Sequence, residues 1–420
     1  MSNLKHHPSS SFGPPWSESN RVRERTRAGA PCSSGSVFSG PRALRSWVLC
    51  AGLALTLTAC RNAPDRTVPG PPLLLITLEE AGDPPTGEAL EILNEGAFRW
   101  SWSAIASSPR VATALGSLHT GLRPWQHGAL DGQTALHPGC ETLALTLKAL
   151  GYETLAYADR ALRLERLGFA RGYSRFGALR SGKRALIDVE ALQPNRFVWI
   201  HVRFDPRRGA AQQWRRARGV LEAAERSPSW PETVVAVVGV TGPGADGLDR
   251  RSLSVPLYLR TPANGTAAQR TPASTSPVAA ARLYETLNEL AGGEPLPATA
   301  ASLLDMDAEA PLFSASYGQP TQREGWRRNE FSLVEGELQL LWRAAVSPSP
   351  RSLPLSGSGN PRLELRRWAD PPDSVERPEV RDAMALRLRR AWLSDLDGEE
   401  PMQWRPLDSN APAQDQSSGL

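Results

Sequence analysis

Short apolar runs separated by longer amphipathic segments constrain the fold of this chain more than any other feature. The first run, LLLITL at residues 73–78, contains one threonine among aliphatic residues and follows two prolines. Such a run is typical of a strand that is buried on both faces, as in a parallel sheet. Four later runs have the same character, at residues 153–158, 196–204, 233–240 and 255–260.

Apolar residues at helical spacing predict helices between and after these runs, over residues 142–152, 211–226 and 278–292. Strands that alternate with helices predict an α/β domain with a mainly parallel central sheet flanked by helices, which we place at residues 71–310. In such sheets, binding sites form in the loops at the C-terminal ends of the strands.

A smaller α+β part is predicted for residues 326–400. The sequence FSLVEGELQLLWRA is typical of a β-hairpin with Glu335-Gly336 at its turn, and RLELRRWAD adds a strand. An amphipathic helix is expected over residues 378–396. Residues 401–420 have the composition of a disordered tail.

Residues 1–59 predict an export signal. A Ser-, Pro-, Gly- and Arg-rich stretch leads into an apolar segment, Trp47–Leu57, that is too short to span a bilayer. The following Leu-Thr-Ala-Cys resembles the bacterial lipobox, whose cysteine carries the lipid. We therefore expect lipidation at Cys60, a tether over residues 60–70, and an exported protein anchored in the cell envelope. An ordinary signal peptide or a poor membrane helix is the alternative.

Charge and cysteine usage exclude two other classes. The net charge of +4 is small for 420 residues, and no stripe alternates arginine with aromatic residues, so nucleic acid is not an expected partner. The four cysteines do not support a disulfide scaffold, because two of them lie in or before the export signal and Cys60 is expected to carry lipid.

The stretch SSPRVATALGSLHTGLRPWQHG at residues 107–128 has the frame of a catalytic loop: small residues, a helical turn, then Thr-Gly and His-Gly. With LLLITLEEAGD before it and TLALTLKALGYETLA after it, the stretch resembles the nucleophile region of the sulfatase family, in the alkaline-phosphatase superfamily. RFVWIHVRFDP, SLSVPLYLRTP and RLELRRWADPP extend the resemblance in the same order, over residues 72–395. The resemblance implies a sulfatase-like α/β fold with a small C-terminal α+β part.

The resemblance also implies a site for hydrolysis of sulfate or phosphate esters. In the family, a divalent metal of the calcium type is held by carboxylates, and cations surround the anion. The first metal carboxylate falls at Glu79, with Glu80 beside it, and a shift of one residue would bring in Asp83. Glutamate oxygens can bind a hard cation, but the extra methylene displaces them. Two surface glutamates at a strand end are the alternative.

The family's nucleophile position falls at Val111, which carries no nucleophilic atom. A local shift would nominate Ser108, in Ser-Pro-Arg, or Thr113. His201 matches a family histidine that follows a strand, and it is the best remaining polar candidate. Packing at the strand end is the alternative for this histidine.

The remaining family positions have also changed. The second pair of metal ligands, Asp-His before glycine, falls at Val240 and Thr241, and the family lysine falls at Asp159. Asp246 and Asp249 lie downstream, in a loop that could return them to the site or leave them solvated.

We therefore favour a sulfatase-fold envelope lipoprotein without catalytic activity that serves as a binding or scaffold protein. Arg110 and Arg207, with Arg123 and Arg203, would border its anion cleft and bind a sulfated or phosphorylated ligand. Solvated surface arginines are the alternative. A second hypothesis is an active sulfuric- or phosphoric-ester hydrolase with a relocated nucleophile and one divalent metal. A third is an unrelated α/β envelope protein.

Overall fold

The computed structural model describes the second of two compact units, Asn62–Leu420, and leaves parts of it undescribed. The described residues are 69–81, 98, 100–130, 132–179, 183–243, 247–262, 277–295, 301–304, 312–317, 327–346, 362–369 and 372–396. The predicted export signal, Cys60 and the tail at 401–420 lie outside these residues, as do Asp83 and Asp246. No helix in the described ranges is both long and apolar enough to cross a bilayer.

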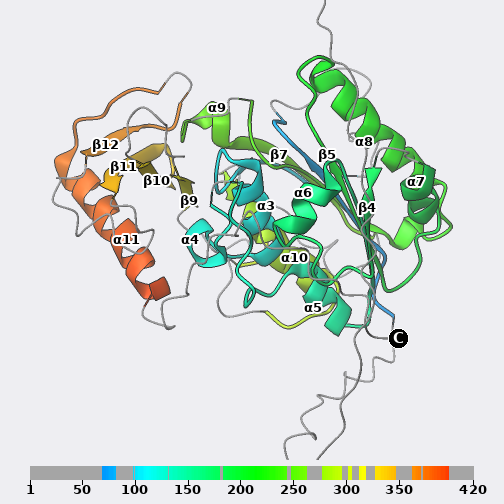
Figure 1. The fold of residues 1–420 in the computed structure, drawn as a ribbon. Coiled ribbons are helices and arrows are strands. Elements are labelled where there is room, and N and C mark those ends of the chain that lie inside the picture. Colours follow the sequence, from blue (N-terminus) through cyan, green and yellow to red (C-terminus); the bar gives the residue numbers. More distant parts are fainter. Residues whose placement is uncertain are drawn as a thin grey trace, which may run out of the picture. The chain divides into compact units, whose positions relative to one another are not determined.

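An eight-stranded, mainly parallel sheet is the centre of this unit, which confirms the predicted fold class (Figure 1). Its strand order is β4-β3-β5-β1-β6-β7-β2-β8, and among these strands β7 alone runs antiparallel to its neighbours. The strands are β1 (Leu73–Leu78), β2 (Trp100–Ile105), β3 (Glu153–Ala158), β4 (Arg175–Ala178), β5 (Arg196–Val202), β6 (Val234–Gly239), β7 (Ser254–Arg260) and β8 (Val278–Ala279).

The first apolar run forms β1, between β5 and β6, and all six of its residues are buried. This position explains its composition, because side chains of a central parallel strand face helices on both sides of the sheet. Thr77 pairs in register with His201 on β5, and Leu78 pairs with Gly239 on β6. The C-terminal ends of the three strands therefore lie together.

Helices cover both faces of the sheet (Figure 1). The apolar side chains of α7 and α8 pack on one face, and those of α3, α5 and α10 pack on the other. The helices are α3 (Val111–Thr120), α4 (Pro124–His127), α5 (Leu143–Ala149), α6 (Ala161–Arg166), α7 (Lys183–Glu190), α8 (Gly209–Glu225), α9 (Arg250–Leu253) and α10 (Leu283–Leu290). Short 3₁₀ turns lie at Trp230–Glu232 and Ala280–Arg282.

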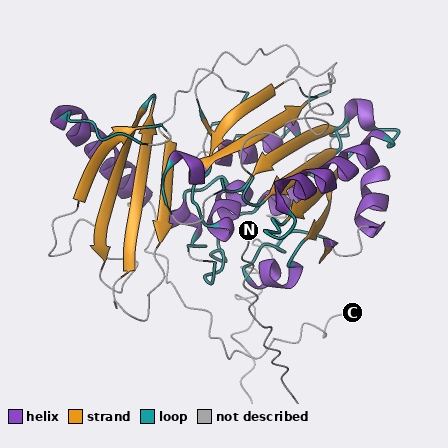
Figure 2. Cartoon of the chain, turned by 90° about the horizontal axis from the view of Figure 1, so that it is seen from above, coloured by secondary structure: helices purple, strands orange, loops and turns teal. Residues whose placement is uncertain are grey.

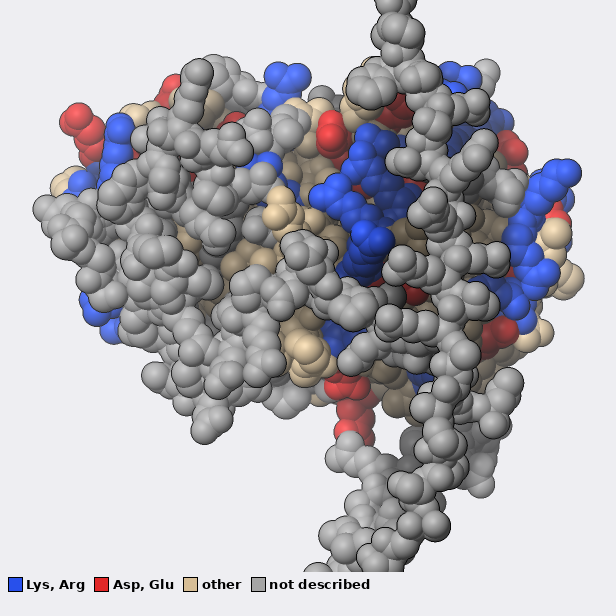
Figure 3. Space-filling view, in the orientation of Figure 1, with Lys and Arg blue, Asp and Glu red and all other residues tan. Residues whose placement is uncertain are grey.

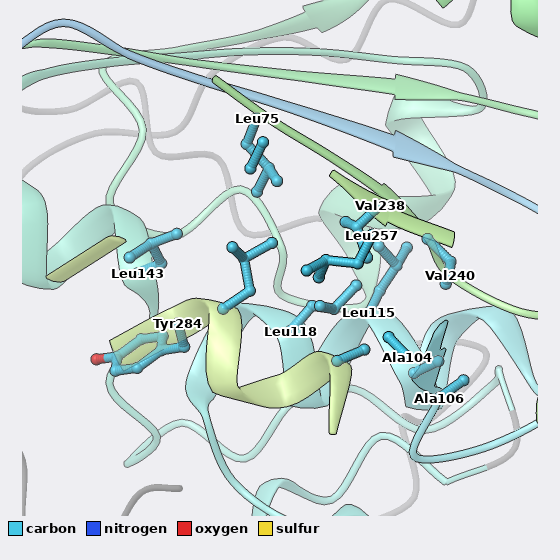
Figure 4. Close-up of a cluster of buried hydrophobic side chains, with 14 of the residues drawn as sticks. Leu75, Ala104, Ala106, Leu115, Leu118, Leu143, Val238, Val240, Leu257 and Tyr284 are labelled. Atoms are coloured by element: carbon cyan, nitrogen blue, oxygen red, sulfur yellow. The ribbon is translucent and has the colours of Figure 1, made fainter. Parts of the chain in front are cut away.

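The larger apolar core lies between the sheet and α3, α5 and α10 (Figure 4). Leu115 and Leu118 of α3 point toward strand residues such as Leu257, with Leu75 above them. Tyr284 of α10 lies beside α5, and its hydroxyl is 2.7 Å from Thr146 Oγ1. The four leucines and Tyr284 are at most 3% exposed. Helix α3, which carries the predicted nucleophile region, is thus held by core packing along most of its length.

A second, antiparallel sheet with order β12-β11-β10-β9 forms the C-terminal part, and α11 packs against three of its strands (Figure 2). Its small core includes Phe331, Trp342, Met384 and Leu388, together with Leu130 from the loop after α4. The elements are β9 (Leu312–Tyr317), β10 (Arg327–Glu335), β11 (Leu338–Val346), β12 (Arg362–Arg367) and α11 (Pro378–Leu396).

The five predicted strands are confirmed to within two residues, and so is the helix at 378–396. The hairpin turn lies one residue later than predicted, at Gly336-Glu337, because Gly336 takes the left-handed backbone (φ 55°). The segment at 278–292 begins with β8 and a 3₁₀ turn before α10. Strand β2 is not among the predicted strands, because WSWSAI has serine at alternate positions where the other strands have aliphatic residues.

Candidate functional site

Side chains from four strand ends meet at the C-terminal edge of the main sheet, where parallel sheets place their binding sites. The backbone ladder continues to this edge: the Glu79 amide donates to the carbonyl of Val202 (3.1 Å), and the Asp159 amide donates to that of His201 (3.1 Å). The residues at these ends are Glu79 and Glu80 after β1, Asp159 and Arg160 after β3, Arg203 after β5, and Thr241 after β6.

The predicted metal carboxylate, Glu79, is part of a buried hydrogen-bond chain. Its Oε1 lies 3.1 Å from Nε2 of His201, whose Nδ1 lies 2.9 Å from Oγ1 of Thr77. The indole Nε1 of Trp199 donates to the same threonine oxygen at 2.9 Å. Glu79 is 8% exposed, and the other three residues are fully buried. The structure thus brings together two residues singled out from sequence, Glu79 and His201.

The contacts fix the proton positions in this chain. Thr77 Oγ1 accepts the indole N–H, and its own proton points to the nearer acceptor, Nδ1 of His201, rather than to the Ile200 carbonyl at 3.5 Å. His201 Nε2–H then donates to Glu79. Hydrolytic triads also join a hydroxyl, an imidazole and a carboxylate. Here, however, the hydroxyl is enclosed in the core and already accepts a hydrogen bond, so the chain orients Glu79 and offers no nucleophile to a substrate.

Two further contacts hold Glu79 in place. Nε2 of Gln213, on α8, donates to the Glu79 carbonyl at 2.6 Å and to the Val202 carbonyl at 3.1 Å. The second carboxylate oxygen of Glu79 lies 3.9 Å from Nε of Arg203. Both oxygens of the predicted metal ligand therefore face cationic or N–H groups of the protein itself.

Glu80 sits on a left-handed backbone (φ 48°), an unusual conformation for a residue with a side chain. Its amide donates to Thr241 Oγ1 at 3.1 Å. Burial raises the pKa of Glu80, the carboxylate of Glu79 raises it further, and Arg203 partly offsets this rise. Thr241, at a position where the family has a metal ligand, thus stabilises the backbone of the loop after β1.

The residues present do not fit the divalent metal that a sulfatase-like site implies. Within the described residues, no three His, Cys, Asp or Glu side chains are arranged to hold a metal ion. Glu79 is engaged as above, and the second ligand pair is Val240 and Thr241. Asp249 caps α9 by accepting the Ser252 amide at 2.8 Å. We therefore derive no chemistry through a metal at this edge.

The residues at the predicted nucleophile positions lie in the start of α3 or are hydrogen-bonded to it. Val111 is the first residue of α3. Ser108 is fully buried, and its Oγ accepts the Arg110 amide at 3.1 Å. Thr113 is fully buried and donates to the Leu130 carbonyl at 2.7 Å. Neither hydroxyl is exposed to a substrate.

The His-Gly of this region is structural. His127 Nδ1 accepts the Ala129 amide at 3.1 Å, so the ring proton lies on Nε2, 3.1 Å from Ser117 Oγ on α3. The ring packs against Gly116, where a Cβ would come within 2.5 Å of it. His119, at the end of α3, stacks edge-on against Trp199 with ring centroids 4.2 Å apart. The motif therefore anchors α3 to the sheet.

Arginines gather where α6 and the end of β5 lie (Figure 3). Asp159, which replaces the family lysine, is held by Arg216 through two hydrogen bonds of 2.6 and 3.1 Å and also accepts the Arg203 amide at 3.0 Å. Burial raises the pKa of Asp159, but the hydrogen bonds from Arg216 and Arg203 outweigh it, so the pKa is lowered. Asp159 is thus an internal partner for arginine.

The other predicted anion-binding arginines are spread over several elements. Arg110 precedes α3 and is half-buried, while Arg207 is exposed after β5, with its amide on Asp205 Oδ1 at 3.0 Å. Arg123 lies over the ring of Phe313 at 4.5 Å, which joins α4 to the second sheet. Arg203 contacts Glu79 at the sheet edge described above, with its Nε 3.9 Å from the carboxylate.

Sequence reasoning missed Thr77, Trp199, Arg160 and Arg216. The first two give no signal of their own, because a threonine and a tryptophan inside strands look like core residues. The pair Asp159-Arg160 did carry one, since a cation directly follows the position where the family has its lysine.

Comparison with known proteins identifies the fold. No protein-family model matches the chain, and no curated protein matches it either. Among solved structures, a 2-O GAG sulfatase aligns with a TM-score of 0.57 at 15% identity, over 78% of this chain and 91% of that one.

Two other solved structures agree. The phosphonate monoester hydrolase of Agrobacterium radiobacter aligns with a TM-score of 0.58 at 12% identity, over 78% of this chain and 96% of that one. A protein in the alkaline phosphatase superfamily from Vibrio parahaemolyticus aligns with a TM-score of 0.51 at 14% identity, over 78% and 88% of the two chains. This chain has the sulfatase-like fold of that superfamily, as the sequence resemblance implied.

Proposed function

We propose that this chain is an exported lipoprotein of the cell envelope that binds anionic ligands on a sulfatase-like fold without hydrolysing sulfate or phosphate esters. One observation carries the proposal: the carboxylate at the metal position, Glu79, is already bonded to His201 at 3.1 Å and faces Arg203 at 3.9 Å. A metal at this place would have to displace an imidazole N–H and stand beside a guanidinium.

The nucleophile position supports the same proposal. Val111 begins α3, and the neighbouring hydroxyls of Ser108 and Thr113 are buried and hydrogen-bonded. Relocating the nucleophile to Thr113 would require unwinding the start of α3, whose residues 112–120 are all buried, and relocating it to Ser108 would require exposing a hydroxyl that is fully buried. Ester hydrolysis would therefore need a rearrangement of the core.

The ligand class follows from the arginines at the sheet edge. Arginine binds sulfate and phosphate groups through two parallel hydrogen bonds. The 2-O GAG sulfatase and the phosphonate hydrolase with the same fold suggest the classes to test. We propose a sulfated or phosphorylated glycan as the ligand. It would bind at the sheet edge, which carries arginines but no set of metal-binding side chains among the described residues.

Metal content tests the loss of activity. Protein purified in the presence of calcium, magnesium, manganese and zinc is expected to contain no stoichiometric metal by mass spectrometry and to release no product from aryl sulfates or phosphates. Glu79→Ala is expected to change neither result. Stoichiometric metal that is lost in Glu79→Ala, together with turnover, would establish the active hydrolase with a single divalent metal instead.

Membrane attachment tests the export part of the proposal. In a bacterial host, the protein is expected in the membrane fraction with a mass increase at Cys60 that corresponds to a lipid. Cys60→Ser is expected to abolish the mass increase and to release the protein from the membrane, because one lipid-bearing residue supplies the anchor. Cys140→Ser, which alters a buried thiol in the folded unit, is the matched control. Membrane association that persists in Cys60→Ser would contradict lipid anchoring.

A further inference from the structure

Arg160 occupies an unusual position at the end of β3. Its backbone is left-handed (φ 58°, ψ 36°), and Glu80, the other non-glycine residue with such a backbone at this edge, follows β1. A non-glycine residue in this conformation costs about 1 kcal/mol or more and persists where the surroundings impose it. The Asp159 side chain, fixed by Arg216, and the start of α6 impose it here. Arg160 lies beside Arg203 at the sheet edge, because the residue before it, Asp159, donates its amide to the His201 carbonyl at 3.1 Å and accepts the Arg203 amide at 3.0 Å.

Among the described residues, the guanidinium of Arg160 is not neutralised by a carboxylate in direct contact with it. Within the described part of the chain, its guanidinium forms no hydrogen bond or ion pair. Burial lowers the pKa of Arg160, and the nearby guanidinium of Arg203 lowers it further, against smaller opposing effects that include the carboxylate of Glu79. Arg160 and Arg203 follow the neighbouring strands β3 and β5, and the Arg203 amide donates to the side chain of Asp159, the residue before Arg160, at 3.0 Å. Two like charges thus lie near each other at this edge, an arrangement that an anion between them would stabilise.

The carboxylates nearby do not neutralise this pair. Asp159 is bonded to Arg216, and Glu79 directs one oxygen to His201 and the other to Arg203 at 3.9 Å. The three guanidiniums of Arg160, Arg203 and Arg216 thus face two carboxylates, which leaves one positive charge. Including Arg163, whose charge acts on Arg160, and Glu80, whose charge interacts with that of Arg203, leaves the same excess of one positive charge.

We propose that Arg160 and Arg203 form a metal-independent site for a singly charged tetrahedral oxyanion, such as a sulfate monoester or a sulfonate, with their guanidinium groups in place of the divalent metal. The proposal rests on the proposed function, since it names the residues and the charge of the anion that such a binding protein takes. An excess of one positive charge favours a monoanion over a phosphate monoester, which carries up to two charges, because the second charge would face Glu79 and Glu80. Two guanidiniums supply the paired N–H donors that match oxyanion geometry.

Binding of anions that cannot be hydrolysed tests the site apart from any activity. The full chain is titrated calorimetrically at low salt with benzenesulfonate, a monoanion, and at mildly alkaline pH with phenylphosphonate, a dianion. Benzenesulfonate is expected to bind, to bind better than phenylphosphonate, and to bind equally well with EDTA present. Arg160→Gln and Arg203→Gln are each expected to weaken its binding about tenfold, the loss of a charge-assisted hydrogen-bond pair.

Matched variants separate the possible outcomes. Arg215→Gln removes an exposed arginine of α8 whose guanidinium contacts its own helix, and it is expected to leave affinity unchanged. Arg160→Lys keeps the charge without the paired donors and is expected to bind at an intermediate level. Unchanged affinity in both glutamine variants, loss of binding with EDTA, or preference for the dianion would overturn this site. Turnover of phenyl sulfate, measured separately, would overturn the proposed lack of hydrolysis and leave the binding result standing.

Discussion

Between about pH 7 and about pH 5, the free energy of unfolding of this protein is expected to fall by about 4 kcal/mol because of two buried histidines, roughly half from each. Burial, together with a smaller effect of the nearby His201, lowers the pKa of His119 from 6.5 to about 3. Burial likewise lowers the pKa of His127 from 6.5 to about 3, against opposing backbone hydrogen bonds.

The direction of the effect follows from which state binds the proton. Between pH 6.5 and about 3, these two side chains are protonated in the unfolded chain and neutral in the folded one. The unfolded state therefore binds more protons, and stability is lost as the pH falls below 6.5. The loss continues until the pH reaches the folded-state pKa near 3, where the folded protein also begins to bind protons.

The geometry explains why neither ring accepts a proton in the fold. His127 Nδ1 already accepts the Ala129 amide at 3.1 Å, so protonation of Nδ1 would place its N–H against the N–H of Ala129. His119 is enclosed by Trp199, Phe169 and Tyr173, and its Nε2 has no hydrogen-bond partner among the described residues. A charge on that ring would be buried among aromatic side chains without a counter-ion.

Urea unfolding at a series of pH values measures this effect, and His119→Leu isolates one of the two groups. The variant is expected to reduce the slope of unfolding free energy against pH by about 1.4 kcal/mol per unit below pH 6, the value for one proton. Phe169→Leu alters the same packing without removing a titrating group, so it is expected to lower stability and keep the slope. A His119→Leu slope equal to that of the unaltered protein would contradict the prediction.

The fold was predictable because its largest elements are locally encoded. β1 and β6 are aliphatic apart from Thr77 and Gly239, and β5 is apolar apart from Arg196 and His201, since central strands are buried on both faces. β2 was not predictable in this way, because it is held in the sheet by pairing with β7, a strand far away in the sequence. Trp100, for example, pairs with Leu259. Strand β9 was missed for a similar reason. Its sequence, LFSASY, contains two serines among apolar residues, and the strand is defined by its pairing with β10.

The site was predictable in position and not in chemistry. The order of motifs placed Glu79 and Asp159 at the sheet edge, where the structure has them. The hydrogen bond between Glu79 and His201 depends on the register of β1 against β5. This register sets Thr77 opposite His201, and Trp199, two residues before His201, lies on the same face of the sheet and donates to Thr77. No local pattern in the sequence encodes that register. Likewise, the turn of Asp159 toward Arg216 joins β3 to α8 across the sheet edge.

Gly242→Ala is expected to destabilise the protein by about 3 kcal/mol or more, or to prevent folding, because a methyl group at this position has no space. A Cβ on Gly242 would lie 2.0 Å from the Arg251 carbonyl oxygen and 3.0 Å from the carbonyl carbons of Arg251 and Ser252. These are backbone atoms, and the Gly242 amide itself donates to the Ser252 carbonyl at 2.8 Å.

The segment opposite Gly242 is unable to retreat, because the second sheet holds it. Leu248, which leads into α9, has its carbonyl clamped by Gln339 at 2.6 Å and by Arg366 at 2.8 Å. Both clamping side chains are buried, at 1% and 8% exposed, and Arg366 also donates to Gln339 at 2.6 Å. Relief of the clash would therefore break hydrogen bonds between the main sheet's edge loop and the C-terminal part.

Thermal and urea unfolding of Gly242→Ala against Gly219→Ala gives the test. Gly219 lies inside α8 with open space around a Cβ, so alanine there is expected to stabilise the protein by about 0.5–1 kcal/mol. Equal stability of the two variants would show that α9 does not pack on Gly242. The family's metal pair precedes this glycine, and here it is Val240 and Thr241 while the glycine remains. A large loss in Gly242→Ala would mean that backbone packing alone requires glycine there, so its presence carries no information about a retained metal site.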